Sequence, residues 1–137
     1  MIKFYRTDHK VLSEITEYED NMWVCMTKPT VDETKLIAED FEIDLADVRA
    51  ALDDEESSRV EVEDGYTLIL VDIPSIEMRN EREAYTTIPL GIILVKDILI
   101  TVCAEDTPVL DAFIESKVKE FSTKKRMRFM YQILYRN

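Results

Sequence analysis

The residues most capable of chemistry in this sequence are four consecutive acids, Asp53, Asp54, Glu55 and Glu56. Carboxylate oxygens are the ligands that Mg²⁺ and Ca²⁺ prefer, so this run predicts a weak site for such a cation. It lacks the Asp-x-Asp-x-Asp-Gly pattern of an EF-hand loop, and a solvated acidic loop is the alternative. Two other acidic groups, Phe41-Glu42-Ile43-Asp44 and Glu61-x-Glu63-Asp64, are weaker candidates.

Side chains suited to catalysis are scarce. His9 is the only histidine, and it falls on an expected loop without a partner at a catalytic spacing. With Gly65 and Gly91 as the only glycines, the chain has no glycine-rich phosphate loop and no Gly-x-Ser-x-Gly motif. Zinc sites favour His and Cys, and the chain has three such residues, widely separated. The sequence therefore predicts a protein that is not an enzyme and requires no cofactor.

The charge is strongly acidic and unevenly distributed. The chain has 17 basic and 29 acidic residues, a net charge of −12. Residues 122–137 hold five of the bases and no acid, which leaves a net charge of −17 on residues 1–121. Such a surface repels phosphate backbones, which argues against nucleic-acid binding, and it attracts cations. A charge that only keeps the protein soluble is the alternative.

The cysteines and the apolar runs bear on location. Cys25 and Cys103 are far apart, and each lies in an apolar run, so both are expected to be buried, reduced thiols of a cytoplasmic protein. The start of the chain has no apolar stretch typical of a signal peptide. Lys96-Asp97 divides the most apolar stretch, Ile88–Ala104, which therefore predicts two buried strands and not a membrane-spanning helix.

The elements that would position these residues begin with three short strands. They are expected at Ile2–Arg6, Val11–Thr16 and Met22–Thr27, with a hairpin loop at Asp8–Lys10 between the first two. Two helices should follow. Thr30-Val31-Asp32-Glu33 has the spacing of a capping box, and Asp44 is expected to cap the second helix.

The second half predicts two hairpins and two further helices. The expected strands are Arg59–Val62, Tyr66–Ile73 (ended by Pro74), Ile88–Val95 and Ile98–Ala104. Glu63–Gly65 suits a turn, and the polar segment Met78–Ala84 suits an exposed loop. Thr107-Pro108 opens a helix whose apolar pattern extends to Phe121. A last helix, capped by Ser122 or Thr123, should carry Met127, Met130, Ile133 and Leu134.

This order of elements predicts an α/β (α+β) fold, a three-layer sandwich with a mixed β-sheet between helices. Residues 1–121 are expected to form the α/β domain, and residues 122–137 the start of a longer helix. Because the chain ends in this last helix, segment 127–135 is expected to bury less than its apolar pattern suggests and to leave an apolar patch.

The order of motifs along the chain resembles the CorA-like magnesium/cobalt transporter family. The similar segments are Phe41–Asp44, Val48-x-x-x-Leu52-Asp53, Ser58–Glu61 (an R/K-V-E strand), Tyr66–Pro74, Thr87–Leu94, Ile98–Cys103, and Lys124-Lys125-Arg126 leading into Met130–Leu134. The last of these is similar to the start of that family's long stalk helix. The likeness covers nearly the whole chain in the right order.

The resemblance implies a soluble cytoplasmic regulatory domain of a divalent-cation channel, in which Mg²⁺ is the transported or regulatory ion. It implies a homopentamer at the cytoplasmic face of the cell membrane. As a fragment cut before the membrane helices, the chain is expected to be monomeric or weakly associated, since its negative charge opposes assembly. A free-standing acidic protein-interaction module is the alternative.

Two features depart from the family pattern. The Gly-Met-Asn pore signature and both membrane helices are missing from this sequence, so the chain alone cannot conduct ions. Some members carry an adjacent Glu-Asp pair of regulatory metal ligands in the helix before the R/K-V-E strand, and here Arg49 and Ala50 occupy those positions. That site cannot be transferred to this chain, and the run from Asp53 to Glu56 is its nearest substitute.

Overall fold

The computed structural model describes residues 1–79 and 82–135. In this part of the chain seven strands form one mixed sheet, in the order β2-β1-β3-β7-β6-β5-β4. The strands are β1 (Ile2–Asp8), β2 (Val11–Ile15), β3 (Trp23–Thr27), β4 (Arg59–Val62), β5 (Tyr66–Arg79), β6 (Arg82–Val95) and β7 (Ile98–Cys103). The helices are α1 (Val31–Asp40), α2 (Leu45–Arg49), the 3₁₀ turn η1 (Ala50–Leu52), α3 (Pro108–Ile114) and α4 (Arg126–Tyr135).

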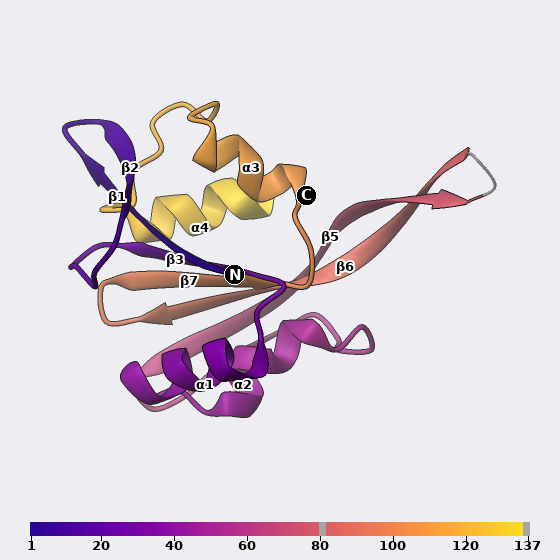
Figure 1. The fold of residues 1–137 in the computed structure, drawn as a ribbon, viewed down its shortest axis with the longest axis horizontal. Helices are drawn as coiled ribbons and strands as arrows, with labels where there is room; N and C mark the ends of the chain where they lie inside the picture. Colours follow the sequence, from indigo (N-terminus) through magenta and orange to yellow (C-terminus); the bar gives the residue numbers. More distant parts are fainter. Residues whose placement is uncertain (80–81, 136–137) are drawn as a thin grey trace.

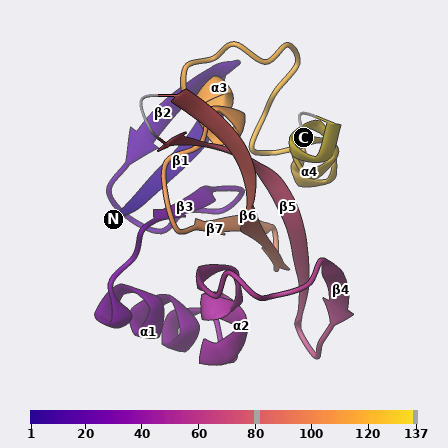
Figure 2. The same cartoon turned by 90° about the vertical axis from the view of Figure 1, so that its right-hand side faces the viewer.

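The helices cover both faces of the sheet. Helices α1 and α2 lie on one side, and α3 and α4 lie on the other (Figures 1 and 2). The prediction of an α/β sandwich with a mixed sheet between helices is therefore confirmed. Each face has its own core: Ile37, Val48 and Leu68 are buried on the first, and Trp23, Phe113 and Phe129 on the second.

A single parallel pairing joins two antiparallel groups of strands. Strands β2, β1 and β3 form one group, and β7, β6, β5 and β4 form the other. They meet where β3 runs parallel to β7, with Trp23 opposite Leu99. The indole Nε1–H of Trp23 donates a 2.9 Å hydrogen bond to Oγ1 of Thr101 on β7, within the core. Cys25 and Cys103, from the same two strands, are buried free thiols, as predicted.

The hairpin of β5 and β6 is longer than the sequence predicts. Pro74 does not end β5, which continues to Arg79, so most of the loop expected at Met78–Ala84 is strand; residues 80–81 of it lie outside the described part. Strand β4 pairs with β5 only as far as Leu70. At Pro74 one edge of β5 is therefore open, which is where a strand tolerates a residue without an N–H. The outer half projects from the sheet as a two-stranded ribbon (Figure 1).

The caps predicted for α1, α2 and α3 are present. The hydroxyl of Thr30 accepts from the Glu33 N–H at 3.1 Å, and the Glu33 carboxylate accepts from the Thr30 N–H at 2.9 Å, completing the capping box of α1. Asp44 caps α2 by accepting from the N–H of Ala46 at 3.0 Å. At the start of α3, the Thr107 hydroxyl accepts in the same way from the backbone N–H two residues further along the chain.

The C-terminal helices differ from their predicted extents. Helix α3 ends at Ile114 and does not reach Phe121, because Ser116 has φ of 58°, outside the helical region. Helix α4 begins at Arg126, and neither predicted cap serves it. Thr123 instead exchanges two hydrogen bonds with Thr7, and the Ser122 hydroxyl accepts from the N–H of Lys124.

Helix α4 packs on the sheet. The expectation of low burial holds for Met127, which is 49% exposed, and is wrong for Met130 and Ile133, which are buried together with Phe129. The reason is that Phe129 enters an aromatic cluster, with its ring centroid 5.0 Å from that of Trp23 and 4.6 Å from that of Phe121. That residues 122–137 begin a longer stalk helix stays a prediction.

A glycine in the turn between β1 and β2 is expected to stabilise the protein. His9 and Lys10 both have positive φ, 50° and 67°. Two-residue hairpin turns with these backbone angles are most often formed by Asn-Gly. Lys10→Gly removes a Cβ that the left-handed region disfavours, so it should raise the free energy of unfolding by about 0.5–1 kcal/mol. Equilibrium urea unfolding measures this. Lys10→Ala, which keeps the Cβ, is the control, and equal stability of the two variants would contradict the prediction.

Candidate metal centre

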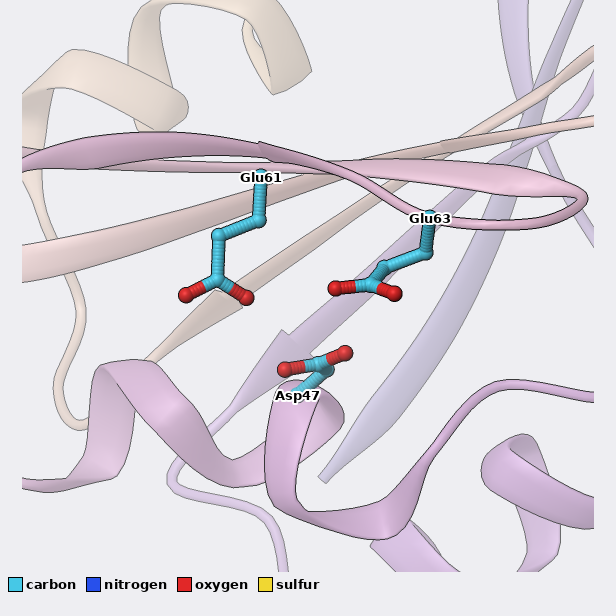
Figure 3. A group of neighbouring side chains, drawn as sticks. All are labelled: Asp47, Glu61 and Glu63. Atoms are coloured by element: carbon cyan, nitrogen blue, oxygen red, sulfur yellow. The ribbon is translucent and has the colours of Figure 1, made fainter.

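Three carboxylates from two neighbouring elements converge at one place. Asp47 lies on α2, Glu61 lies on β4, and Glu63 directly follows β4. One oxygen from each lies within 4.8 Å of the other two, and the three side chains point toward one another (Figure 3). Among the residues that the structure describes, this is the group of acids with the geometry to hold a cation.

Local structure explains how these acids meet. Side chains alternate along a strand, so Glu61 and Glu63 share one side, and it is the side that faces α2. Asp44 is the N-cap of α2, which places Asp47 in the first turn of the helix. The hydroxyl of Tyr66 donates to Oδ2 of Asp47 at 2.5 Å and accepts from the N–H of Asp44 at 3.3 Å. Tyr66 therefore ties the start of α2 to the β4–β5 hairpin.

The electrostatics of the group leave room for a cation. Glu61 bonds Nε of Arg59 at 2.6 Å, and the same guanidinium bonds Glu56 at 2.5 Å, which raises the pKa of Arg59. Burial, followed by the bond to Asp47, raises the pKa of Tyr66 to about 12, so Tyr66 is a donor at neutral pH. Asp47 and Glu61 are half-buried and Glu63 is exposed. Arg59 pairs with Glu61 of the group, and the three clustered carboxylates repel one another, an arrangement that a divalent cation would neutralise.

Two acids of the weaker sequence candidate, Glu61 and Glu63, belong to this group, whereas the run of four acids predicted first lies beside it. Asp53, Asp54 and Glu55 are exposed on the segment between η1 and β4, and the Asp53 carboxylate accepts from the N–H of Glu55 at 3.0 Å. Glu56 is linked to the group indirectly, through Arg59. The structure does not bring the four carboxylates of this run together as one cluster. A metal site at Asp53–Glu56 stays a prediction.

The positions where some family members carry a metal-binding Glu-Asp pair have a structural role here. Nη1 of Arg49 donates to Oγ1 of Thr34 at 2.9 Å, which links α2 to α1. Ala50 is buried in the core on the side of the sheet that α1 and α2 cover. Neither residue offers a ligand atom to a cation, so Asp47, two residues before Arg49 on α2, is the acid of that helix that can contribute.

Comparison with known proteins identifies the family. The family model described as "CorA-like Mg2+ transporter protein" matches residues 18–137. The chain belongs to the CorA-like family. This confirms the resemblance seen in the order of its motifs. No curated protein matches the chain.

Solved structures share the fold at low sequence identity. The soluble domain of CorA from Methanocaldococcus jannaschii superposes with a TM-score of 0.78 at 22% identity, over 99% of this chain and 55% of that one. The complete CorA magnesium transporter of the same organism gives 0.73 at 19% identity, over 99% and 44%. The ZntB cytoplasmic domain from Vibrio parahaemolyticus gives 0.72 at 14% identity, over 97% and 55%. This CorA-like chain thus spans about half the length of these structures.

Within the described part of this CorA-like chain, no helix combines the length and the apolar character that crossing a membrane requires.

Proposed function

We propose that this chain is the cytoplasmic regulatory domain of a CorA-like divalent-cation transport protein, and that it senses Mg²⁺ through Asp47, Glu61 and Glu63. The family match supports the transport context. The observation that carries the sensing role is the convergence of these three carboxylates. The proposed role is not enzymatic. The full-length protein would be a homopentamer in the cell membrane, with this domain on the cytoplasmic face.

A cation at this group would couple ion concentration to the position of α2. Without the ion, repulsion between Asp47 and the two glutamates favours separating α2 from β4; with it, the three carboxylates are drawn together. Mg²⁺ takes few protein ligands and keeps several waters, so the exposed side at Glu63 suits water or a carboxylate of a neighbouring subunit. A conformation that binds the ion more tightly is then populated as its concentration rises.

The acidic run Asp53, Asp54, Glu55 and Glu56 is the alternative location for the ion within the same proposal. Its side chains diverge, because neighbours in an extended or helical segment point in different directions. We propose that it raises the local cation concentration, while Asp47, Glu61 and Glu63 provide the ligands.

Melting experiments distinguish the two locations. At a Mg²⁺ concentration about ten times the dissociation constant, expected in the millimolar range, binding should stabilise the fold by about 1.4 kcal/mol, which raises Tm by a few degrees. Asp47→Asn with Glu63→Gln should abolish this shift, and the matched pair Asp53→Asn with Asp54→Asn should keep it. The comparison salt is NaCl at equal ionic strength.

Two outcomes would contradict the proposal. A Mg²⁺-specific shift that survives in the Asp47/Glu63 variant and is lost in the Asp53/Asp54 variant would place the ion on the acidic run. An equal shift in both salts would mean charge screening without a site. The second outcome would favour the interaction module, for which the edge strand β4 offers two exposed valines, Val60 at 64% and Val62 at 80%.

A further inference from the structure

A cavity of about 690 Å³ opens on the opposite side of the sheet from the carboxylates. Three stretches form its wall: the β1–β2 hairpin with Lys10 and Leu12, the segment 116–122, and the residues that lead into α4. A cavity of this size is typical of sites for small molecules. Three of the residues that line it, Leu12, Val118 and Phe121, are apolar.

The charge around this cavity is opposite to that of the chain. The chain as a whole carries −12, yet four of the lining residues are lysine or arginine and one, Glu120, is acidic. Lys124 bonds Asp8 at 3.3 Å. The other three bases, Lys10, Lys125 and Arg128, have no ion pair with any residue that the structure describes. The cavity is therefore a positively charged place on an acidic domain.

The start of α4 makes this concentration of bases unfavourable unless an anion is present. Lys124 and Lys125 directly precede the helix, Arg126 and Arg128 lie in its first turn, and that turn holds no acid. The N-terminal end of a helix carries a partial positive charge. Basic side chains are therefore repelled from it, and a bound anion is attracted to it. A bound anion would relieve this repulsion.

The walls of the cavity are held in place before any ligand arrives. Thr7 and Thr123, both buried, exchange hydrogen bonds of 2.9 and 3.1 Å between each backbone N–H and the other's hydroxyl. This pair of hydrogen bonds joins β1 to the segment before α4. Phe121 is fixed by edge-on contacts with Trp23 and Phe113. A rigid site binds with a smaller loss of conformational entropy.

We propose that this cavity binds a phosphate-bearing small molecule of the nucleotide class. Its phosphates would lie at Lys10, Lys125 and Arg128, since ammonium and guanidinium groups form charge-assisted hydrogen bonds with phosphate. Its ring would lie against the apolar side chains of Leu12 and Phe121, which line the cavity. This goes beyond the proposed cation sensing, because none of these residues belongs to the carboxylate group. Phospholipid headgroups offer the same phosphate chemistry, and the experiment distinguishes them.

The test is calorimetric titration of the chain with ATP, in EDTA and at fixed ionic strength. Wild type should bind ATP saturably, more tightly than tripolyphosphate or adenosine alone. Lys125→Ala with Arg128→Ala should weaken ATP binding by about tenfold or more. Lys35→Ala, which removes an exposed base from α1 on the other side of the sheet, should leave the affinity unchanged. Lys10→Gly should weaken binding while melting no lower than wild type, which separates lost binding from lost folding.

Several results would overturn the proposal. They are the absence of saturable ATP binding by wild type, equal affinity in the Lys125/Arg128 variant and wild type, or an equal loss in the Lys35 control. Binding to vesicles of phosphatidylglycerol and phosphatidylcholine without binding to ATP would assign the cavity to a lipid surface. The Asp47/Glu63 variant should bind ATP normally, so failure of cation sensing and failure of this site give different results.

Discussion

Replacing Trp23 by alanine is expected to lower the free energy of unfolding by about 4 kcal/mol. Trp23 is fully buried, and its ring lies 5.1 Å from Tyr5 and 5.0 Å from Phe129, centroid to centroid. Truncation leaves a large cavity among these rings and removes the donor to the buried Thr101 hydroxyl. Small domains have a total stability of about 5–15 kcal/mol, so the variant should be close to unfolded at moderate temperature.

Urea unfolding followed by far-UV circular dichroism measures this loss, because Trp23 is the only tryptophan and its fluorescence disappears in the variant. Trp23→Phe is the matched control. It keeps most of the apolar volume but not the N–H, and should cost about 1–3 kcal/mol. A loss below about 1 kcal/mol in the alanine variant would mean that this core does not depend on Trp23.

Replacing Gly91 by valine is expected to cost about 2–3 kcal/mol, for a reason of space and not of backbone conformation. A Cβ at Gly91 would lie 3.2 Å from the Cβ of Ala51 on η1 and 3.7 Å from that of Val102 on β7. The two γ-methyl groups of valine would meet the same neighbours. Because η1 precedes the acidic run and β4, pushing it outward should also weaken the response to Mg²⁺.

A pair of smaller changes tests the cause. Gly91→Ala should cost less than the valine variant, and adding Ala51→Gly should recover part of that cost, since the two Cβ atoms then no longer compete for one space. Urea unfolding of the two single variants and the double variant gives the coupling. Purely additive effects would contradict this explanation, because additivity is expected of residues that do not touch.

Features specified by neighbouring residues could be predicted from the sequence. The capping box of Thr30 and Glu33, the cap at Asp44 and the turn at Gly65, where φ is 91°, each depend on a few adjacent residues. The α/β class follows from the same local patterns, because alternating strands and helices must bury their apolar faces against one another. These predictions are confirmed.

Features that depend on distant residues could not be predicted in this way. Thr123 has the chemistry of a helix cap, but it bonds Thr7 from the other end of the chain. Pro74 remains within a strand because β4 leaves that edge open, which depends on the strand order. The carboxylate group combines both cases. The shared side of Glu61 and Glu63 follows from strand periodicity, whereas nothing in their spacing indicates that Asp47 on α2 lies opposite them.

The parallel pairing of β3 with β7 has a consequence for how fast the chain folds. Strands β1 and β2, and strands β4 to β7, pair with near neighbours in sequence, so each group closes only short loops. The pairing of Trp23 with Leu99 closes a loop that contains both helices of the first layer and most of the second group. The chain loses the conformational entropy of this long loop before it gains the contacts between β3 and β7, so this pairing should limit the folding rate. During synthesis, β3 must wait with its apolar residues exposed until β7 has been made.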